Sequence, residues 1–373
     1  MSSSARCGSA DAGDDRGPVP DTRPAASGAR HTRPGGRAVS ASRQCAVLAA
    51  MLATPAWHSR AASDGPVLRV VADVPLPGPP VRFGYVSLDA GKNRLYIAHM
   101  GAGTIVVFDL KNRRVAATIA DVPGVTGVLA VPALRRVYAS VTRLHQVTVI
   151  DDRTLRVVAR LGDVGFPGGI AYAPDQRKIY VADEGGGGML VIDGRTDRVL
   201  HTIRLDGEAG AALFDPGSRC IMVAVPSRNE VYVIDPATER ILGRFELAGA
   251  ARPHGLAIDA ARRRVFVANE TNARLLMVDL KTMRVIDTDQ VGDAPDAVAF
   301  DPGWRRLYVA SETGVVSVFT ETTTGLVHDG DIAVPHAHTI VVDPRTHLVY
   351  LPLQDVDGRP VLRIMSSDPP SGS

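Results

Sequence analysis

The sequence is poor in cysteine and in recognisable catalytic motifs. It has three cysteines in 373 residues, and Cys220 is the only one beyond residue 63. A framework of disulfide bonds within residues 64–373 is therefore excluded, and we expect Cys220 to be a small buried hydrophobe in a strand. No Cys-x-x-Cys-His, His-Glu-x-x-His or Gly-x-Ser-x-Gly sequence occurs. These absences argue against a c-type haem site, a zincin-type metal site and a nucleophile elbow.

No apolar run is long enough to span a bilayer as a helix. The most apolar stretch near the N-terminus covers residues 45–54, follows four arginines between residues 30 and 43, and precedes the small-x-small sequence at 59–61. This order of basic, apolar and small residues predicts an export signal around residues 30–61. We therefore expect a periplasmic or secreted protein in which residues 1–63 are a leader and a disordered segment. The alternative is a disordered low-complexity tail.

The charge balance provides no excess of positive charge. The chain has 42 Lys and Arg against 40 Asp and Glu, which gives a formal net charge of +2. Residues 1–63 contain eight Arg and four Asp, so the remainder has 34 minus 36, or −2. A protein that binds nucleic acid through phosphates needs a basic surface. The charge balance therefore argues against nucleic acid as a partner, and we expect a small-molecule, glycan or peptide ligand instead.

What the sequence does contain is a repeat of about 42 residues. One anchor position recurs in seven successive units, with spacings of 42, 42, 42, 44, 42 and 42 residues: Asp89, Val131, Ala173, Asp215, Asp259, Asp301 and Asp343. Units of this length with several short alternating strands are typical of propeller blades, which must stack to bury both faces. The sequence therefore predicts an all-β fold, a monomeric seven-bladed β-propeller of four-stranded blades over residues 64–366. A short disordered tail is expected over residues 367–373.

Two columns of residues within the repeat are expected to be structural. In the sixth unit, strands are expected at 297–301, 307–310, 315–319 and 325–328. Large apolar residues recur in the second strand of each unit and predict core packing: Tyr96, Tyr138, Tyr180, Met222, Phe266, Tyr308 and Tyr350. Aspartates end the third strand in five units and predict hairpins in which the side chain bonds its own backbone: Asp109, Asp151, Asp193, Asp235 and Asp279.

The seventh unit lacks a fourth strand, because the sequence after residue 364 consists mainly of Ser, Pro and Gly. Residues 67–72 stand ahead of the first unit at about the offset of a fourth strand. We expect this N-terminal strand to complete the last blade, which would close the ring without a long unpaired edge.

The ends of several second strands resemble those of the YVTN or YncE-like seven-bladed propeller family. The sequences are Tyr-Val-Ala-Asp-Glu at 180–184, Phe-Val-Ala-Asn-Glu at 266–270 and Leu-Tyr-Val-Ala-Ser-Glu at 307–312. The resemblance covers residues 67–365. It implies an exported propeller, with surface-layer and single-stranded-DNA-binding relatives, and it names no reaction.

The repeat breaks at one position, five residues ahead of each anchor. The seven residues there are Gly84, Thr126, Gly168, Gly210, His254, Asp296 and His338. In a propeller, the connections before the first strand and after the second strand of each blade surround the mouth of the central channel. Acidic side chains also follow the second strands of the third, fifth and sixth units. We therefore expect one sector of the mouth to hold His254, Glu270, Asp296, Glu312 and His338, with His99, Asp183, Glu184, Asn269 and His336 near it.

Imidazole and carboxylate groups at one rim suit a ligand site, a divalent metal ion or a general acid–base pair. His254 and His338 are the candidate catalytic residues. The same two histidines with Glu270, Asp296 and Glu312 are the candidate metal ligands. The first interpretation is a binding or scaffold protein with a ligand site at the mouth, and no cofactor beyond the possible divalent ion is indicated. A water-filled funnel with solvated side chains is the simplest alternative.

A second interpretation is a metal-dependent hydrolase or lyase. Glu184, Asn269, Glu270 and Asp296 are similar in type and location to the metal ligands of gluconolactonase-like propellers. The sequence Pro-His-Gly-Leu at 253–256 is similar to the His-Gly of streptogramin-lyase-like propellers. These resemblances imply a lactonase-like activity at the same mouth, although a shared fold does not determine function.

Overall fold

The computed structural model of this protein describes residues 67–369. These residues form 28 β-strands and four 3-10 helices of three residues each, and no helix among them is long and apolar enough to cross a bilayer. The predicted leader at residues 1–63 and residues 370–373 of the predicted tail lie outside the described part of the chain.

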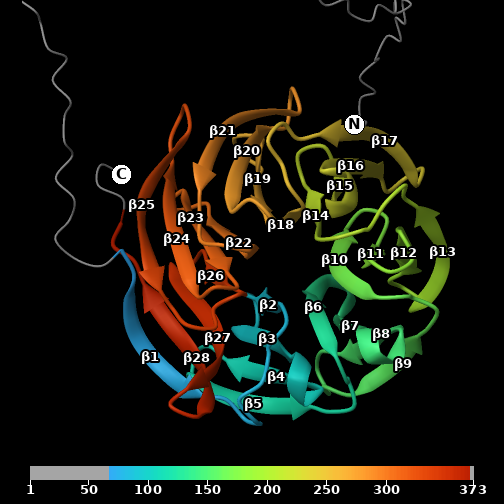
Figure 1. The fold of residues 1–373 in the computed structure, drawn as a ribbon. Helices are drawn as coiled ribbons and strands as arrows, with labels where there is room; N and C mark the ends of the chain where they lie inside the picture. The colour runs from blue at the N-terminus through green and yellow to red at the C-terminus, as the bar shows by residue number, and fades with distance from the viewer. Residues whose placement is uncertain (1–66, 370–373) are drawn as a thin grey trace, which may run out of the picture. The chain divides into compact units, whose positions relative to one another are not determined.

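The strands form seven antiparallel sheets of four strands each, arranged as blades in a ring (Figure 1). The predicted seven-bladed propeller is therefore confirmed. Blades 1 to 3 contain β2 (Val86–Asp89), β3 (Arg94–His99), β4 (Thr104–Asp109) and β5 (Arg114–Ile119); β6 (Val125–Val131), β7 (Arg136–Val141), β8 (Gln146–Asp151) and β9 (Val157–Leu161); β10 (Pro167–Ala173), β11 (Lys178–Asp183), β12 (Gly188–Asp193) and β13 (Arg198–Arg204).

Blades 4 to 6 follow the same order. They contain β14 (Ala212–Asp215), β15 (Cys220–Val225), β16 (Glu230–Asp235) and β17 (Arg240–Glu246); β18 (Pro253–Asp259), β19 (Arg264–Asn269), β20 (Arg274–Asp279) and β21 (Arg284–Gln290); β22 (Pro295–Asp301), β23 (Arg306–Ser311), β24 (Val315–Glu321) and β25 (Leu326–Ala333). The 3-10 helices are η1 (Met100–Ala102), η2 (Pro132–Leu134), η3 (Thr142–Leu144) and η4 (Pro226–Arg228).

The last blade is completed by the N-terminal strand, as the sequence predicts. Its strands are β26 (Val341–Asp343), β27 (Leu348–Val356), β28 (Arg359–Ser366) and β1 (Arg69–Pro75), and β1 pairs antiparallel with β28. Figure 1 shows the blue β1 beside the red β28 on the outside of the ring. Asp73 and Arg363 face each other in this pair and form an ion pair at 2.6 Å.

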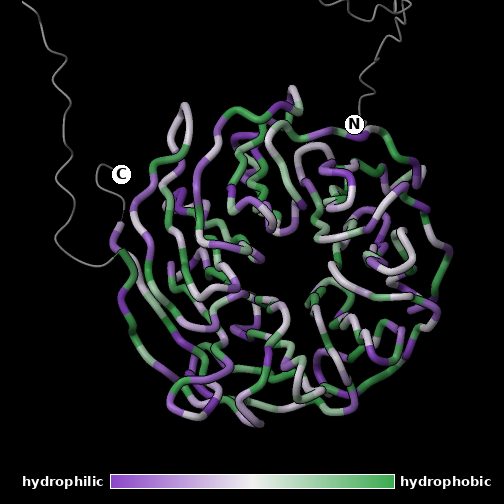
Figure 2. The backbone as a smooth tube through the Cα atoms, viewed as in Figure 1, coloured by the Kyte–Doolittle hydropathy of each residue, from purple (hydrophilic) through white to green (hydrophobic). Residues whose placement is uncertain are grey.

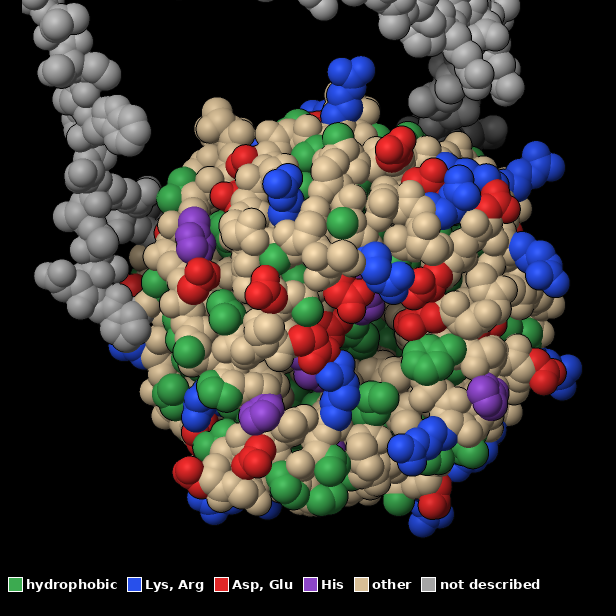
Figure 3. All heavy atoms as spheres, in the orientation of Figure 1, with side chains coloured by type: hydrophobic (Ala, Val, Ile, Leu, Met, Phe, Trp, Pro, Cys, Tyr) green, Lys and Arg blue, Asp and Glu red, His purple; other side chains and the backbone are tan. Residues whose placement is uncertain are grey.

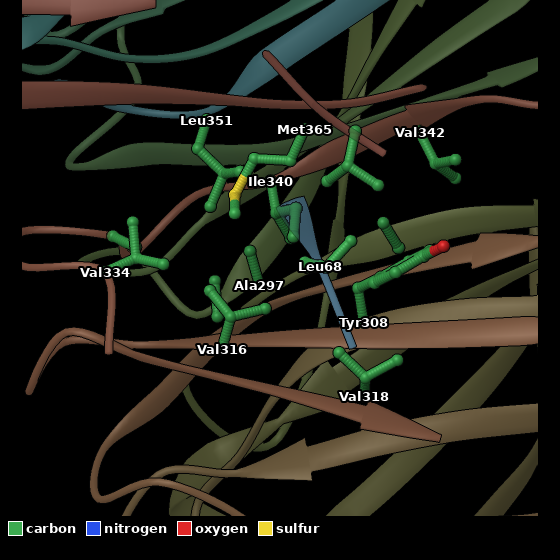
Figure 4. Packing of buried hydrophobic residues seen from close by; sticks show 14 of the residues in the cluster. Leu68, Ala297, Tyr308, Val316, Val318, Val334, Ile340, Val342, Leu351 and Met365 are labelled. Atoms are coloured by element: carbon green, nitrogen blue, oxygen red, sulfur yellow. The ribbon is translucent and has the colours of Figure 1, made fainter. Parts of the chain in front are cut away.

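Residues on either side of the closing strand are also held by the last blades. Leu68 is 2% exposed and lies in an apolar cluster that joins blades 6 and 7 (Figure 4). Beyond β28, Ser367 is buried and its hydroxyl lies 3.0 Å from that of Tyr308. The carbonyl of Asp368 accepts a hydrogen bond from Arg306 at 2.6 Å. The predicted tail thus begins with residues that contact the propeller.

Burial follows the position of a strand in its blade. The second and third strands are almost wholly buried, whereas the fourth strands consist mainly of exposed and half-buried residues, which alternate strictly in β9, β17 and β21. Figure 2 shows hydrophilic and hydrophobic residues mixed along the outer strands of the ring. The predicted apolar column is confirmed as core, because each of its seven residues is at most 3% exposed. Cys220 is also fully buried, at the start of β15.

The recurring aspartates close hairpins, as expected. Asp215, Asp259 and Asp301 each accept the backbone N–H of the residue two positions further along, at 2.8, 2.9 and 2.9 Å. Asp235 does the same after a third strand, at 2.9 Å. These carboxylates satisfy backbone donors at their own turns, which is a folding role.

Candidate functional site

Three side chains from consecutive blades meet where the inner strands begin. His254 lies on β18 and Asp296 on β22, and His338 stands just before β26. They are spaced by 42 residues, so they occupy the same place in blades 5, 6 and 7. The structure brings these three predicted residues into direct contact.

Asp296 is the centre of this contact. Its Oδ2 lies 2.7 Å from Nδ1 of His338, and its Oδ1 lies 3.0 Å from Nδ1 of His254. The hydroxyl of Tyr85 donates a third hydrogen bond to Oδ1 at 2.6 Å. Burial alone would raise the pKa of Asp296, but the hydrogen bonds and charges of the two histidines outweigh it and hold the pKa far below the usual range. Asp296 is therefore a buried carboxylate with three donors.

The two histidines differ in their second ring nitrogen. Nε2 of His338 lies 2.8 Å from the carbonyl oxygen of Phe83, whereas Nε2 of His254 has no hydrogen-bond partner among residues 67–369. His254 is also more exposed, at 22% of its side chain against 8% for His338. Burial lowers the pKa of His254, but the hydrogen bond and charge of Asp296 raise it to about 9.

Tyr85 is a part of the site that sequence reasoning missed. It stands four residues ahead of its anchor, and the equivalent positions in the other blades hold only small residues: Gly127, Gly169, Ala211, Gly255, Ala297 and Thr339. Small residues are required where inner strands approach closely, since a Cβ on Gly255 would lie 2.5 Å from the carbonyl oxygen of Asp296. Comparing the blades at the position four residues ahead of each anchor, instead of five, would have identified Tyr85.

Two arginines at equivalent positions in blades 1 and 5 bind the acidic rim. Arg82 forms a two-pronged ion pair with Glu312, in which one nitrogen lies 2.9 Å from Oε2. Arg252 bonds Glu208 at 3.1 and 3.3 Å and Glu270 at 3.3 Å. Figure 3 shows acidic, basic and histidine side chains gathered around a hollow near the middle of this face.

Glu184 differs from the other rim acids because its carboxylate has no hydrogen bond or ion pair within the described part of the chain. It lies over Gly168, where a Cβ would come within 2.0 Å of its Oε1. Burial raises the pKa of Glu184 to about 7. The glycine at the mouth position of blade 3 thus makes room for an unpaired acid.

Two cavities lie one behind the other along the channel. The outer cavity has a volume of about 190 Å³ and includes Arg82, Phe166, Glu270 and Glu312 in its lining. The inner cavity, of about 240 Å³, lies among the inner strands. The residues that line both cavities are Tyr85, Glu184, His254 and Asp296. These four side chains form the constriction between the mouth and the channel.

Two residues expected near the mouth are engaged by local backbone groups instead. Asp183 accepts the N–H groups of Gly165, Phe166 and Gly186, at 3.1, 2.8 and 2.9 Å. The amide of Asn269 donates to Val267 and Arg274 at 3.0 and 3.1 Å and accepts from Ala251 at 3.3 Å. Both side chains brace loops, and neither lines the outer or the inner cavity.

Two histidines also lie away from the cavities. His99 is fully buried and stacks on the ring of Phe83 with centroids 4.2 Å apart, and burial lowers the pKa of His99. His336 is exposed and has a left-handed backbone with φ of 64°. Neither lines the outer or the inner cavity, and neither contacts the central group of His254, Asp296 and His338.

Comparisons with known proteins identify the fold and no family. No protein-family profile matches this sequence, and no curated protein matches it either. A solved structure with a similar fold is a chain of hydrazine synthase from Kuenenia stuttgartiensis, at a TM-score of 0.65 and 15% sequence identity. The similarity covers 77% of this chain and 96% of that one. At this identity it shows a shared propeller, and the YncE-like relationship stays a prediction.

Proposed function

We propose that this protein is an exported, monomeric, YncE-like propeller that binds a small polar ligand at the channel mouth, between His254 and Glu184. One observation carries the proposal: at the constriction shared by both cavities, Nε2 of His254 and the carboxylate of Glu184 have no partner among the described residues. Most other charged groups of the rim are already paired. Export rests on the sequence of residues 30–61.

The geometry favours a ligand that offers several polar atoms. Polar groups in a concave site normally fix the orientation of a ligand through a small number of placed hydrogen bonds. Here one imidazole nitrogen and one carboxylate are available, with Tyr85 and Phe166 as ring surfaces beside them. A sugar unit or the end of a peptide offers hydroxyl or amide groups that could bond both. The cavity of about 190 Å³ favours a small molecule or one unit of a longer chain.

The proposal is tested by thermal-shift assays with two defined panels, free monosaccharides and free amino acids. A binding compound should raise the melting temperature of the full chain but not of the Glu184→Gln or His254→Ala variants. Glu246→Gln and His328→Ala are matched controls, because both residues lie on outer strands and are exposed. Panels that leave the wild type unchanged, or shifts that persist in the Glu184→Gln/His254→Ala double variant, would contradict the proposal.

Hydrolysis of a lactone is the second candidate function, and one observation favours it. Asp296 holds Nδ1 of His254 and so aims Nε2 toward the cavity, which is how a carboxylate orients a catalytic imidazole. In the neutral imidazole, which predominates above about pH 9, Nε2 would take a proton from water as the oxygen adds to the carbonyl. The leaving alkoxide would take that proton as the ring C–O bond breaks. The metal ligands expected from the lactonase resemblance support this less well, since Asn269 braces a loop and Glu270 is paired with Arg252.

The two candidates are separated by a turnover assay with δ-valerolactone in a pH-stat. Hydrolysis by the wild type that disappears in His254→Ala, with the His328→Ala control unaffected, would favour the enzyme. Absence of turnover together with a thermal shift from a monosaccharide or amino acid would favour the binding protein.

A further inference from the structure

We propose that Asp296, Glu312 and Nδ1 of His338 form a binding site for one divalent transition-metal ion, such as Zn²⁺ or Mn²⁺. Each residue offers one ligand atom, and the three atoms lie within 4.8 Å of one another. Asp296 and His338 are buried and Glu312 is half-buried, and all three line the outer cavity. This set differs from the one that the lactonase resemblance implies.

The hydrogen bonding of His338 supplies the first reason. The carbonyl oxygen of Phe83 can only accept, so Nε2 of His338, 2.8 Å away, must carry a hydrogen. In the absence of an ion, Nδ1 donates its own hydrogen to Asp296, and once that hydrogen is released Nδ1 presents a lone pair. That lone pair faces two carboxylates, with Oδ2 of Asp296 at 2.7 Å and Oε1 of Glu312 at 3.7 Å. Three acceptors in one place require a bound proton or a cation between them.

The contact between Nε2 of His338 and the carbonyl oxygen of Phe83 also resembles the contacts that orient histidine ligands in metal sites. Metal-ligating histidines commonly donate their other ring N–H to a carbonyl or carboxylate, which fixes the tautomer and the ring orientation. Phe83 does this for His338, and Tyr85 holds the far oxygen of Asp296 at 2.6 Å. Two of the three ligands are therefore already oriented by groups that would not themselves bind the ion.

Arg82 supplies the positive charge beside Glu312. Its guanidinium pairs with Glu312, and the two side chains are 47% and 34% exposed. An ion pair this exposed is weak, because water screens it and both side chains lose freedom. A divalent ion held by a second carboxylate and an imidazole should displace the guanidinium from Glu312. Arg82 thus competes with the ion and tunes its affinity.

The ligand set indicates the class of ion. Imidazole nitrogen with carboxylate oxygen suits Zn²⁺ and Mn²⁺, whereas Mg²⁺ and Ca²⁺ prefer oxygen ligands alone. Three protein ligands leave at least one position for water or a bound molecule. The ion needs no ligand in the cavity, so this proposal is independent of the proposed function. If no metal ion bound, the proposed ligand-binding function would be unaffected, and the metal site would likewise be unaffected if no ligand bound.

The experiment measures Zn²⁺ alone on the full chain, by equilibrium dialysis and metal analysis and by competition with a fluorescent chelator. We expect the wild type to bind one Zn²⁺ that is lost from both Glu312→Gln and His338→Gln. Their affinity should fall at least roughly tenfold, the lower bound seen even for outer-shell partners. Arg82→Ala should bind Zn²⁺ several-fold more tightly, because it frees Glu312.

Blade 5 offers matched controls for the Glu312 and Arg82 variants. Glu270 and Arg252 stand at the equivalent positions and are also ion-paired, through one contact at 3.3 Å. Glu270→Gln and Arg252→Ala should leave this Zn²⁺ affinity unchanged. Equal affinity in Glu312→Gln and the wild type, or no ion bound by Arg82→Ala, would overturn the proposal. Glu312 is half-buried, so this test holds even if His338→Gln fails to fold.

Discussion

Two aspartates on the same strand, β22, show how the two ends of a blade differ. Asp301 ends the strand at a hairpin, where it is fully buried and accepts the N–H of Gly303 at 2.9 Å. A histidine of the next blade, His347, also bonds it at 2.6 Å. Asp296 stands five residues earlier, at the mouth. The residues at the equivalent position in the other blades are glycine, threonine or histidine. The hairpin end carries an aspartate in five of the seven blades, whereas the mouth end carries one only in blade 6.

The partners of the two carboxylates explain this difference. Asp301 satisfies a backbone donor two residues away, a requirement that every hairpin of this kind shares. Asp296 receives only side-chain donors in its short contacts, from blades 1, 5 and 7. A local backbone partner indicates a role in folding. Side chains that converge from separate blades indicate a functional site. Substitutions at the hairpin end and at the mouth end can test these two assignments.

The largest effect is expected from removing a repeated element of the scaffold. Deleting residues 64–76 should abolish folding, because it removes Leu68 from the core between blades 6 and 7 and leaves β28 as an unpaired edge. Circular dichroism during heating should show no cooperative transition. Asp73→Asn, which alters only a partly exposed ion pair on β1, should cost about 1 kcal/mol or less. A deletion variant with an unchanged melting temperature would refute closure by β1.

A substitution at the hairpin end should lower the free energy of unfolding and leave Zn²⁺ binding intact. Asp301→Ala should lower the free energy of unfolding by about 3–5 kcal/mol, because it breaks a buried pair with His347 and orphans a backbone donor. Urea unfolding measures this loss. Zn²⁺ affinity of the folded protein should remain that of the wild type. A selective loss of Zn²⁺ binding without a stability change would contradict the assignment of Asp301 to the scaffold.

Glu321, at the hairpin end of β24, should make stability depend on pH. Burial and a hydrogen bond with Asp259 raise the pKa of Glu321 to about 7, above the 4.5 of an unperturbed Glu. Between these pH values the folded state holds a proton that the unfolded state has lost. Stability from this group is therefore full below about pH 4.5 and decreases as pH rises to about 7.

The change attributable to Glu321 should be on the order of 1–3 kcal/mol. Urea unfolding at pH 5 and pH 8 should show a smaller decrease in Glu321→Gln than in the wild type. The exposed residue Glu246 provides the control, and Glu246→Gln should follow the wild-type profile. Parallel profiles for all three proteins would show that Glu321 is ionised in the folded state.

The fold could be predicted from the sequence because each blade of a propeller repeats the same pattern of strands at a spacing of about 42 residues. Comparing equivalent positions also isolated His254, Asp296 and His338, which the structure brings together. It could not show that Asp183 and Asn269 brace loops, since their partners depend on the paths of individual connections. The pairing of Arg82 with Glu312 was also hidden, because it joins residues 230 positions apart through ring closure.

The smallest effect on stability is expected from removing either of two hydroxyl groups, one at the mouth and one at a hairpin. The hydroxyl of Tyr85 donates to Asp296 at 2.6 Å at the mouth, and that of Tyr138 donates to Asp197 at 3.0 Å in a hairpin. Tyr85→Phe and Tyr138→Phe should each cost about 0.5–1.5 kcal/mol of stability, the net value of one hydrogen bond. Stability alone therefore should not distinguish them.

Zn²⁺ affinity should distinguish them. Tyr85→Phe removes a donor that orients Asp296, and loss of such a partner weakens metal binding roughly tenfold. Tyr138→Phe should leave the affinity unchanged, because Asp197 is remote from the mouth. Chelator competition on the two folded variants gives the comparison directly. If both variants bound Zn²⁺ equally, the hydroxyl of Tyr85 would belong to the scaffold, and the mouth would differ from the hairpins in sequence but not in role.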